Sequence, residues 1–538
     1  MNCRDLTQAL AEPSAYPQLV DRVEMRQTHI SVVFLAGSFA YKIKKPVHLG
    51  FVDYSTLERR RHFCKEEVRW NRRLAPGVYL GVVPVTRQGG SIRMEGTGDV
   101  VEWAVKMQRL PDGATLGSHL EAGRLSNQAL EEWARRLSRF HASAESGARV
   151  IDGGSLPAIA RNARENLDQA EAQVGVTLSR STFDRLRDRT EAAMARWGPL
   201  ISDRANRGVP RDTHGDLRLD HVYWFPDREP PSDWIAVDCI EFDARYRHAD
   251  PIADIAFLAM ELTLEGRDDL ARAFVEAYLQ AAGDGEGRPL LPFYRAYRAA
   301  VRGKVEGLKL AEAEIPEVER FAARARARAL WLLALAELEE PSAKPCLVLV
   351  GGLPGAGKSS LARDLAQHAG FTVIRSDEVR KQLTGRGGPT SSRAPFAGDI
   401  YTPDWNERTY AACLRRAEER LFEGGRVLVD ASFREQSRRR LFLDAARRWG
   451  VTACLILCQA DPEVIRDRLA GRRGDASDAD FDIHAEVARR WEEPDAATRS
   501  RTRAIDTGGT RSQTLARALG VLREFQVLLG TVQDRPDP

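Results

Sequence analysis

The chain has 538 residues, of which 43% are hydrophobic and 29% are charged, and its formal net charge is +3 at pH 7. This length predicts about two to four domains, and the small net charge argues against binding driven by a global electrostatic field. No apolar run approaches the roughly 18 residues of a membrane-spanning helix, and the first residues lack the apolar core of a signal peptide. The seven cysteines are scattered without a CxxC pair, so we expect a reduced, cytoplasmic protein without a cysteine metal site.

The first part of the chain changes character near residue 110. Strand-like runs lie at 30–35, 39–44 and 100–107, with one helical stretch at 56–74 between them. From 126 to 338 the pattern is mostly helical, with short strand-like pieces near 211–243. A small mixed lobe followed by a helical lobe is one way to build a two-lobed ATP cleft. We therefore predict an N-terminal α+β domain over 1–338, with a small lobe at about 1–110 and a helical lobe at about 111–338.

The segment 339–345 reads Glu-Glu-Pro-Ser-Ala-Lys-Pro, and its two prolines predict a linker. After it, strand-like and helical patterns alternate. The candidate strands are 347–350, 372–375, 427–429, 453–457 and 504–505. Such alternation is typical of an α/β domain with a parallel sheet, which we expect over 346–538.

A glycine-rich stretch joins the first of these strands to a helical pattern. It reads Gly-Leu-Pro-Gly-Ala-Gly-Lys-Ser over 352–359 and fits the phosphate-binding loop pattern G-x-x-x-x-G-K-[ST] without a mismatch. The pattern predicts that Lys358 reaches the β- and γ-phosphates of ATP and that the Ser359 hydroxyl holds Mg²⁺. The residues expected to contact the nucleotide are Gly352, Leu353, Pro354, Gly355, Ala356, Gly357, Lys358, Ser359 and Ser360.

Charged residues follow the later strands of the same domain. Asp377 comes after the second strand, where a carboxylate faces the phosphate loop and could take a proton from an attacking hydroxyl; capping of the next helix is the alternative role. Asp430 ends the third strand and is predicted to lie at the metal. Arg468 and Arg472 lie on a later helix and its exit, where they suit a lid that neutralises phosphoryl charge.

These motifs resemble the phosphate-loop kinases that are gluconate-kinase-like, zeta-toxin-like or 5′-hydroxyl polynucleotide kinases. In that group an aspartate followed three residues later by an arginine serves as base and substrate-phosphate contact, and Asp377 and Arg380 match that spacing. The resemblance implies an ATP-dependent kinase whose acceptor is a hydroxyl of a small molecule or of a nucleic-acid end.

A second motif, Thr-His-Gly-Asp-Leu-Arg-Leu-Asp-His, lies at 213–221. It resembles the catalytic loop of aminoglycoside phosphotransferase-like kinases, His-Gly-Asp-Leu-x-x-x-x-Asn. The resemblance implies that Asp216 orients the substrate hydroxyl. His221 stands where the family's metal-binding asparagine is expected. Because Mg²⁺ prefers oxygen ligands, this departure puts the use of Mg²⁺ in the first half in doubt.

Further pieces follow in that family's order. Lys42 on a predicted strand matches the phosphate-binding lysine, with Lys44 as the alternative, and Glu67 on the next helix matches its ion-pair partner. Asp238 matches the metal-binding aspartate, with Glu241 as the alternative. The segment 105–111 resembles the adenine-binding hinge, and 250–254 the family's structural Asp-Pro-x-x-Asp segment.

Between the strands expected at 30–35 and 39–44 only a tight hairpin fits, rather than a glycine-rich cover over ATP. The first half is therefore predicted to be a second kinase or a pseudokinase. In the latter case the chain would be an ATP-dependent regulatory switch. The whole order resembles bacterial fusions of an aminoglycoside phosphotransferase-like domain with a phosphate-loop AAA or kinase domain. We expect no membrane partner and no stable nucleic-acid complex, and the sequence indicates neither the acceptor nor the oligomeric state.

Overall fold

The computed structural model describes residues 3–49, 52–312, 315–384, 402–471 and 481–529. These residues pack into two compact units that interleave along the chain. The first unit comprises Met1–Ala163, Met194–Thr263 and Arg267–Arg295, and the second comprises Arg164–Ala193, Leu264–Gly266 and Ala296–Pro538. Because the two units interleave, their division does not test the linker expected at 339–345, which stays a prediction.

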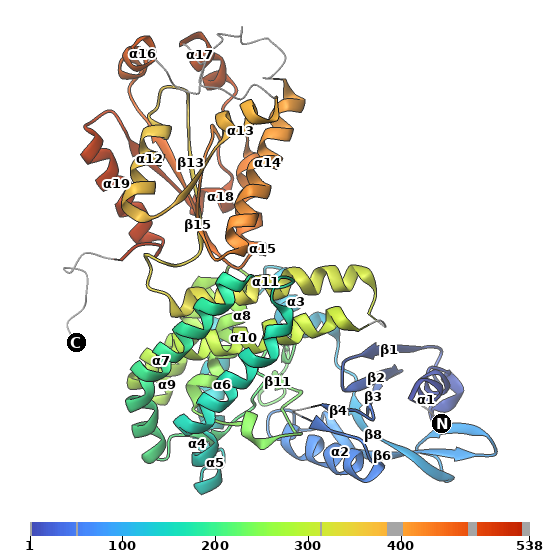
Figure 1. Ribbon diagram of the computed structural model, residues 1–538. Coiled ribbons are helices and arrows are strands. Elements are labelled where there is room, and N and C mark those ends of the chain that lie inside the picture. Colours follow the sequence, from blue (N-terminus) through green and yellow to red (C-terminus); the bar gives the residue numbers. More distant parts are fainter. Residues whose placement is uncertain (1–2, 50–51, 313–314, 385–401, 472–480, 530–538) are drawn as a thin grey trace. The chain divides into compact units, whose positions relative to one another are not determined.

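The first unit contains an antiparallel six-stranded sheet with the order β1-β2-β3-β8-β6-β7 (Figure 1). Its strands are β1 (Val23–Gln27), β2 (Ser31–Ala36), β3 (Phe39–Lys44), β6 (Tyr79–Gln88), β7 (Ser91–Met94) and β8 (Asp99–Gln108). The strands predicted from the sequence correspond to β2, β3 and β8, whereas β1, β6 and β7 were not predicted. Helix α2 (Leu57–Asn71) lies where a helix was expected and begins at Thr56, whose side chain accepts a hydrogen bond from the Arg59 backbone N–H.

Both faces of this sheet are covered. Tyr41 and Ile43 of β3 join a buried cluster with Leu6 and Leu10 of helix α1 (Cys3–Leu10). Successive side chains of a strand point to opposite faces. The even positions of β3, which include both of its lysines, therefore face the side that α2 covers.

Between residues 109 and 345 the chain is mostly helical, and its helix α8 (Pro251–Leu264) is almost entirely buried. The other helices of this stretch are α3 (Leu116–Glu121), α4 (Asn127–Ser143), α5 (Ala148–Gly153), α6 (Leu156–Ala170), α7 (Arg180–Asn206), α9 (Asp268–Ala282), α10 (Leu291–Leu308) and α11 (Glu317–Leu338). Short strands are β4 (His48–Leu49), β5 (Val52–Asp53), β9 (Arg211–Asp212), β10 (Val222–Trp224), β11 (Trp234–Ala236) and β12 (His248–Ala249). Because almost every residue of α8 is buried, the helix gives the segment at 250–254 a rigid base.

The second unit contains a parallel five-stranded sheet with the order β14-β15-β13-β16-β17 (Figure 1). Its strands are β13 (Cys346–Gly352), β14 (Thr372–Arg375), β15 (Arg426–Asp430), β16 (Thr452–Gln459) and β17 (Thr502–Asp506). Its helices are α12 (Lys358–Ala369), α13 (Ser376–Leu383), α14 (Pro403–Phe422), α15 (Gln436–Arg448), α16 (Pro462–Ala470), α17 (Phe481–Arg489), α18 (Ala496–Ser500) and α19 (Arg511–Glu524). The predicted fold class, an α+β region followed by a phosphate-loop domain with a parallel sheet, is confirmed.

The run of apolar residues in β13 is explained by its central position. Leu347 and Leu349 pack on one face of the sheet with residues of α13, α14 and α15. Val348 and Val350 pack on the other face with residues of α12 and α19. Because helices cover both faces, every side chain of the strand is buried and the pattern is continuous rather than alternating. The carboxyl ends of the strands then meet at one edge of the sheet, where ligands of such folds bind.

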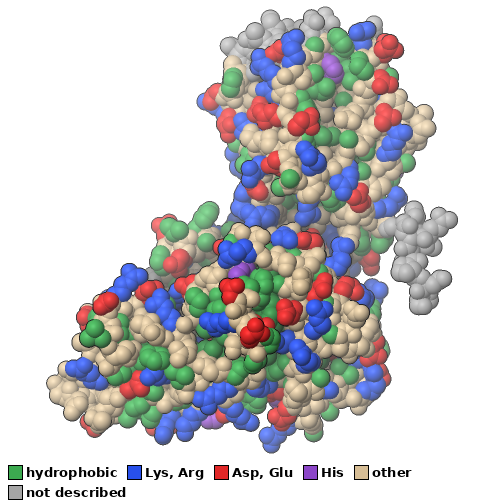
Figure 2. Space-filling model, turned by 180° about the vertical axis from the view of Figure 1, so that it is seen from behind, with side chains coloured by type: hydrophobic (Ala, Val, Ile, Leu, Met, Phe, Trp, Pro, Cys, Tyr) green, Lys and Arg blue, Asp and Glu red, His purple; other side chains and the backbone are tan. Residues whose placement is uncertain are grey.

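The surface of the molecule is mixed in charge. On the face that Figure 2 shows, basic and acidic side chains are interspersed. This distribution agrees with the net charge of +3. Within the described ranges, no helix combines the length and the apolar character needed to cross a membrane.

Candidate active sites

The phosphate loop joins β13 to α12 in a backbone conformation that requires glycine. Gly352, Gly355 and Gly357 have positive φ angles of 138°, 82° and 83°, which side chains other than glycine rarely adopt. A Cβ atom at Gly352 would lie 2.5 Å from the carbonyl oxygen of Cys458. The loop ends at the N-terminus of α12, where free backbone N–H groups favour an anion. The arrangement is therefore a cradle for phosphate.

Lys358 and Ser359 occupy the first turn of α12. The Lys358 Nζ atom donates a hydrogen bond of 2.9 Å to the backbone oxygen of Leu353, across the loop. The ammonium group is thereby held over the cradle. Ser359 and Ser360 both line the adjoining cavity. The structure thus places each of these predicted nucleotide contacts at one end of the same helix.

Two carboxylates lie at the carboxyl edge of the same sheet. Asp430 is the last residue of β15, is paired in register with Val350 of β13, and is 4% exposed. Asp377 lies in the first turn of α13, directly after β14. Burial, and then the nearby Asp430 carboxylate, raise the pKa of Asp377 above its ordinary value, although Lys358 opposes them. A carboxyl group whose pKa is raised next to a phosphate cradle suits a general base.

Two arginines add positive charge to this edge. Arg380, one turn beyond Asp377, is 6% exposed. Arg468 of α16 donates from Nη2 to the backbone oxygen of Thr507 at 2.6 Å. Its Nη1 atom is buried and, among the described residues, has no hydrogen-bond partner. A buried guanidinium nitrogen without a partner costs free energy, and a phosphate oxygen would satisfy it.

A cavity of about 380 Å³ opens beside the loop. Seven of the residues that line it were not predicted from the sequence: Leu361, Asp364, Leu469, Thr507, Gly509, Arg511 and Thr514. The Thr507 hydroxyl donates to the backbone oxygen of Ala356 at 2.8 Å, which ties the end of β17 to the phosphate loop. The Thr-x-x-Gln capping box at 510–513 could have indicated that a helix begins here.

One of the predicted site residues, Arg472, lies outside the described residues.

In the first unit, both lysines of β3 meet the buried Glu67 of α2. Lys42 Nζ lies 2.9 Å from Glu67 Oε1 and 2.5 Å from Asp238 Oδ1. Lys44 Nζ lies 2.7 Å from Glu67 Oε2 and also pairs with Glu241. Each lysine therefore has its own second carboxylate.

The pairing distinguishes the alternatives left open by the sequence. Lys44 is 1% exposed and its partner Glu241 also accepts a hydrogen bond of 2.7 Å from the Tyr54 hydroxyl, so this pair is internal. The side chain of Asp238, in contrast, is 42% exposed. Desolvation would raise the pKa of Asp238, but nearby positive charge, that of Lys42 first, outweighs it and lowers that pKa. The geometry favours Lys42 and Asp238 as the pair that faces a ligand.

The loop with the His-Gly-Asp motif brings Asp216 and His221 to Asp238. His221 Nδ1 lies 2.9 Å from the backbone oxygen of Asp216 and 3.4 Å from its Oδ2 atom. His221 Nε2 lies 3.7 Å from Asp238 Oδ2. The imidazole therefore stands between Asp216, the predicted catalytic carboxylate of this unit, and Asp238, its predicted metal-binding carboxylate.

Asp254 of α8 binds the backbone of this loop. Its carboxylate accepts hydrogen bonds from the backbone N–H groups of His214 at 3.1 Å and Gly215 at 2.8 Å. His141 Nε2 lies 3.1 Å from the same carboxylate. Burial lowers the pKa of His214 to about 4, so the ring is neutral at pH 7. Asp254 is thus a structural residue, in agreement with the role that the Asp-Pro-x-x-Asp segment implied.

The hairpin between β2 and β3 is as short as expected. Ala36 pairs directly with Phe39, so only Gly37 and Ser38 form the turn. The Arg109 backbone N–H donates to the Ser38 oxygen at 2.9 Å, which closes the turn onto the segment predicted as the hinge. A glycine-rich cover over ATP is therefore replaced by a closed two-residue turn.

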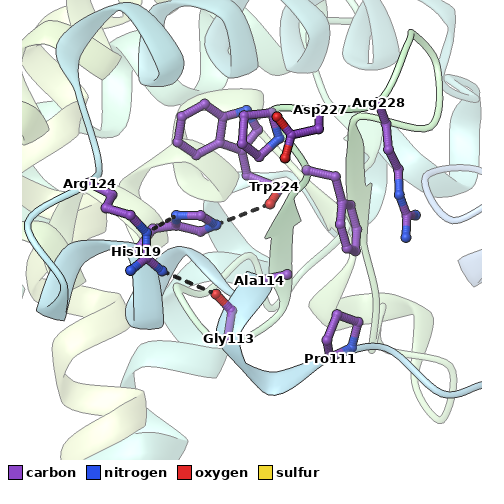
Figure 3. A pocket seen from close by; sticks show the side chains of 10 residues that line it. Pro111, Gly113, Ala114, His119, Arg124, Trp224, Asp227 and Arg228 are labelled. Atoms are coloured by element: carbon purple, nitrogen blue, oxygen red, sulfur yellow. Dashed lines mark hydrogen bonds between the residues drawn. The ribbon is translucent and has the colours of Figure 1, made fainter.

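A hollow of about 550 Å³ lies next to this hinge (Figure 3). Arg124 donates from Nε to His119 Nδ1 at 3.3 Å, and His119 Nε2 lies 3.1 Å from the backbone oxygen of Trp224. None of the predicted catalytic residues is among those that line it. We assign it no role in the chemistry.

Similarity to known proteins extends over the whole chain. The uncharacterized protein Rv2004c of Mycobacterium tuberculosis is 33% identical over 501 residues, which are 93% of this chain and 95% of that protein. The uncharacterized protein Mb2027c of Mycobacterium bovis matches to the same extent. A family model described as an AAA domain matches residues 347–494.

Solved structures cover the two parts separately. The GDP complex of aminoglycoside 2′-phosphotransferase-IIIa is 13% identical and covers 62% of this chain and 99% of its own, with a TM-score of 0.38. A gluconokinase from Sinorhizobium meliloti is 22% identical and covers 34% of this chain and 94% of its own, with a TM-score of 0.26.

The fold defines a class of protein in which an α+β unit and a phosphate-loop domain with a parallel sheet share one chain. Within that class, this chain belongs to the family of the uncharacterized mycobacterial proteins named above.

Proposed function

We propose that the protein is an ATP-dependent phosphotransferase that transfers the γ-phosphoryl group to a hydroxyl group through its phosphate-loop domain. The observation that carries this proposal is the meeting of Lys358, Asp377 and Asp430 at one edge of the parallel sheet. Binding of ATP alone would need the loop, but a carboxylate with a raised pKa beside it is what a base for a hydroxyl acceptor requires.

Each residue of the proposed site has a role that its position supports. The Ser359 hydroxyl and the Asp430 carboxylate are hard oxygen ligands of the kind that Mg²⁺ prefers, and Mg²⁺ bound there would neutralise charge on the β- and γ-phosphates. Asp377 accepts the proton of the acceptor hydroxyl. Lys358 and Arg468 neutralise the charge that develops on the transferred group.

Arg380 would contact the acceptor side of the site, because it lies one turn beyond Asp377 on α13. The acceptor itself is proposed as a small molecule or the end of a polynucleotide. We propose no stable nucleic-acid complex and no membrane partner. A cytoplasmic location is supported by the buried free thiols of Cys64, Cys239, Cys346, Cys413, Cys454 and Cys458.

A second candidate function concerns the first unit. The contacts among Lys42, Glu67 and Asp238 favour a second nucleotide site there, in which Asp216 would orient an acceptor hydroxyl. The closed turn at Gly37 and Ser38 favours instead a pseudokinase that binds ATP and regulates. The two differ in one measurable respect, since only the first makes acceptor phosphorylation depend on Asp216.

The proposal is tested by incubating the full-length protein with Mg²⁺, labelled ATP and a panel of sugars, sugar acids, nucleosides, amino alcohols and 5′-hydroxyl oligonucleotides. We expect label on at least one acceptor. Asp377→Asn should lower that rate by about 10²- to 10⁴-fold while ATP binding persists. Asp461→Asn, an exposed aspartate that makes no capping hydrogen bond, is the matched control. Absence of transfer to every acceptor would refute the proposal.

A further inference from the structure

His221 is held in one orientation by the loop on which it lies. Its Nδ1 atom is 2.9 Å from the backbone oxygen of Asp216. A carbonyl oxygen can only accept a hydrogen bond, so Nδ1 carries the proton. In the neutral ring the lone pair is then on Nε2. A histidine that donates from one ring nitrogen to a backbone carbonyl and presents the other is the usual arrangement of a metal-binding imidazole.

The free nitrogen faces the exposed carboxylate of the site. Nε2 lies 3.7 Å from Asp238 Oδ2, which is beyond the length of a hydrogen bond. Two metal–ligand bonds of about 2.1 Å each can span that separation. The other carboxylate oxygen, Oδ1, is already bound to Lys42 at 2.5 Å. Oδ2 is therefore the oxygen of Asp238 that remains for a cation.

The backbone conformation of Asp238 also constrains the position of its carboxylate. Asp238 has a positive φ of 63°, which is uncommon for a residue other than glycine. Its backbone N–H donates a hydrogen bond of 3.1 Å to the Tyr79 hydroxyl. Residues in such conformations cluster at functional sites, where the surrounding structure holds them.

We propose that the site of the first unit takes a divalent transition-metal ion in preference to Mg²⁺, with His221 Nε2 and Asp238 Oδ2 as its protein ligands. Mg²⁺ strongly prefers oxygen ligands, whereas imidazole suits Fe²⁺, Ni²⁺, Cu²⁺ and Zn²⁺, and Mn²⁺ stands first in the same series of rising affinity. Replacement of the expected asparagine by histidine exchanges an oxygen ligand for a nitrogen ligand. The metal preference of this site therefore differs from that of the phosphate-loop site, whose ligands Ser359 and Asp430 offer oxygen alone.

The metal binds together with a nucleotide. In the part of the chain that the structure describes, no group of three or more His, Cys, Asp or Glu side chains could hold a metal ion. The two protein ligands therefore need phosphate oxygens and water to complete the coordination. The inference rests on the proposed nucleotide site of the first unit, and it is independent of phosphoryl transfer by the phosphate-loop domain.

The test is pulsed electron paramagnetic resonance on full-length Lys358→Ala protein, a background in which nucleotide binding at the phosphate loop is weakened. Mn²⁺ and β,γ-methylene ATP, whose triphosphate contains no nitrogen, are the probes. We expect ¹⁴N modulation of the imidazole type on the bound Mn²⁺. His221→Asn should abolish it and lower the preference for Mn²⁺ over Mg²⁺ by at least about tenfold. His62→Asn, an exposed histidine of α2, should change neither.

Bound Mn²⁺ without imidazole modulation in the Lys358→Ala protein would overturn the inference, and this reading does not depend on whether the His221 variant folds. Absence of any Mn²⁺–nucleotide complex in that protein would overturn it too. Modulation that persists in His221→Asn would assign the nitrogen to another residue and refute the proposed ligand. None of these readings requires turnover, so failure of the proposed transfer reaction would be seen separately, in the acceptor assay.

Discussion

Arg468 lies half-buried on α16, and its two terminal nitrogens have different surroundings. Nη2 is bound to the Thr507 backbone oxygen, whereas Nη1 is buried without a partner among the described residues. The first nitrogen fixes the direction of the guanidinium group, and the second is free to bind an anion. The residue thus combines an anchor with a ligand contact.

We predict that Arg468→Ala weakens ATP binding by about tenfold to a hundredfold, the free-energy equivalent of one charge-assisted hydrogen bond. Isothermal titration calorimetry with ATP would measure the change. Arg415→Ala, which removes an exposed guanidinium of α14, should leave the affinity unchanged. Equal affinities for wild type and Arg468→Ala would show that Arg468 does not contact the nucleotide.

The raised pKa of Asp377 predicts the direction in which the acid limb of the kcat/KM–pH profile moves when a neighbouring charge is removed. A general base acts in its deprotonated form, so kcat/KM should rise with pH through the pKa of Asp377. Burial and then Asp430 raise this pKa, while Arg380 is among the cations that lower it. Arg380→Gln removes one opposing cation and should therefore move the acid limb of the profile to higher pH.

The control for this pH profile is Arg408→Gln on the exposed surface of α14, for which we expect an unchanged limb. A limb that stays in place or moves to lower pH in Arg380→Gln would exclude Asp377 as the titrating base. A limb at the pKa of an ordinary aspartate, about 3.9, would exclude it as well.

At the scale of elements, the catalytic loop of the first unit depends on α8. The loop has little regular structure of its own, and Asp254 ties it to a helix that is buried on all sides. Two backbone N–H groups and His141 share one carboxylate. Substitution by asparagine replaces an acceptor oxygen by a donor, so at least one of these groups loses its partner.

We predict that Asp254→Asn destabilises the protein by about 3 kcal/mol, since hydrogen bonds to a buried charge contribute up to about that amount. Thermal unfolding of the full chain followed by calorimetry should show a fall of several degrees. Asp269→Asn, whose partner Arg267 is at the surface, should cost less than about 1 kcal/mol. Similar melting temperatures for the two variants would contradict the structural role of Asp254.

At the scale of the whole molecule, the sequence predicted most where a local pattern determines the backbone. The loop over 352–359 needs its glycines for positive φ angles and for the close approach of Gly352 to the Cys458 backbone. Its amino-acid sequence alone therefore predicts its conformation. Strands β3 and β14 have the predicted bounds. Strand β6 was not predicted because Gly81 and Pro84 interrupt its pattern, and its pairing with β8 is irregular between Tyr79 and Gly81.

The sites were harder to predict where a residue's role depends on a contact that no sequence motif encodes. Thr507 contacts the phosphate loop through its hydroxyl and the Ala356 carbonyl, and no motif records such a bond. The choice between Lys42 and Lys44 likewise depends on which carboxylate each lysine meets in space. The orientation of His221 is set by the Asp216 carbonyl, which the sequence cannot show.

The two proposed nucleotide sites have different predicted roles. If the phosphate-loop domain performs the transfer, Lys358→Ala should abolish the share of acceptor phosphorylation that this domain carries, whether or not the first unit is active. If the first unit transfers as well, a separate fraction of acceptor phosphorylation should depend on Asp216. Lys358→Ala and Asp216→Ala therefore measure how much of the acceptor phosphorylation each unit performs.

The most direct test of the central claim is Mg²⁺-dependent ATP turnover of wild type, Lys358→Ala and Asp216→Ala, each with and without the pooled acceptors. We expect Lys358→Ala to abolish the acceptor-stimulated turnover of the phosphate-loop domain, and we expect this turnover to persist in Asp216→Ala. Acceptor-stimulated turnover that is unchanged in Lys358→Ala would contradict the claim that the phosphate-loop domain is the kinase.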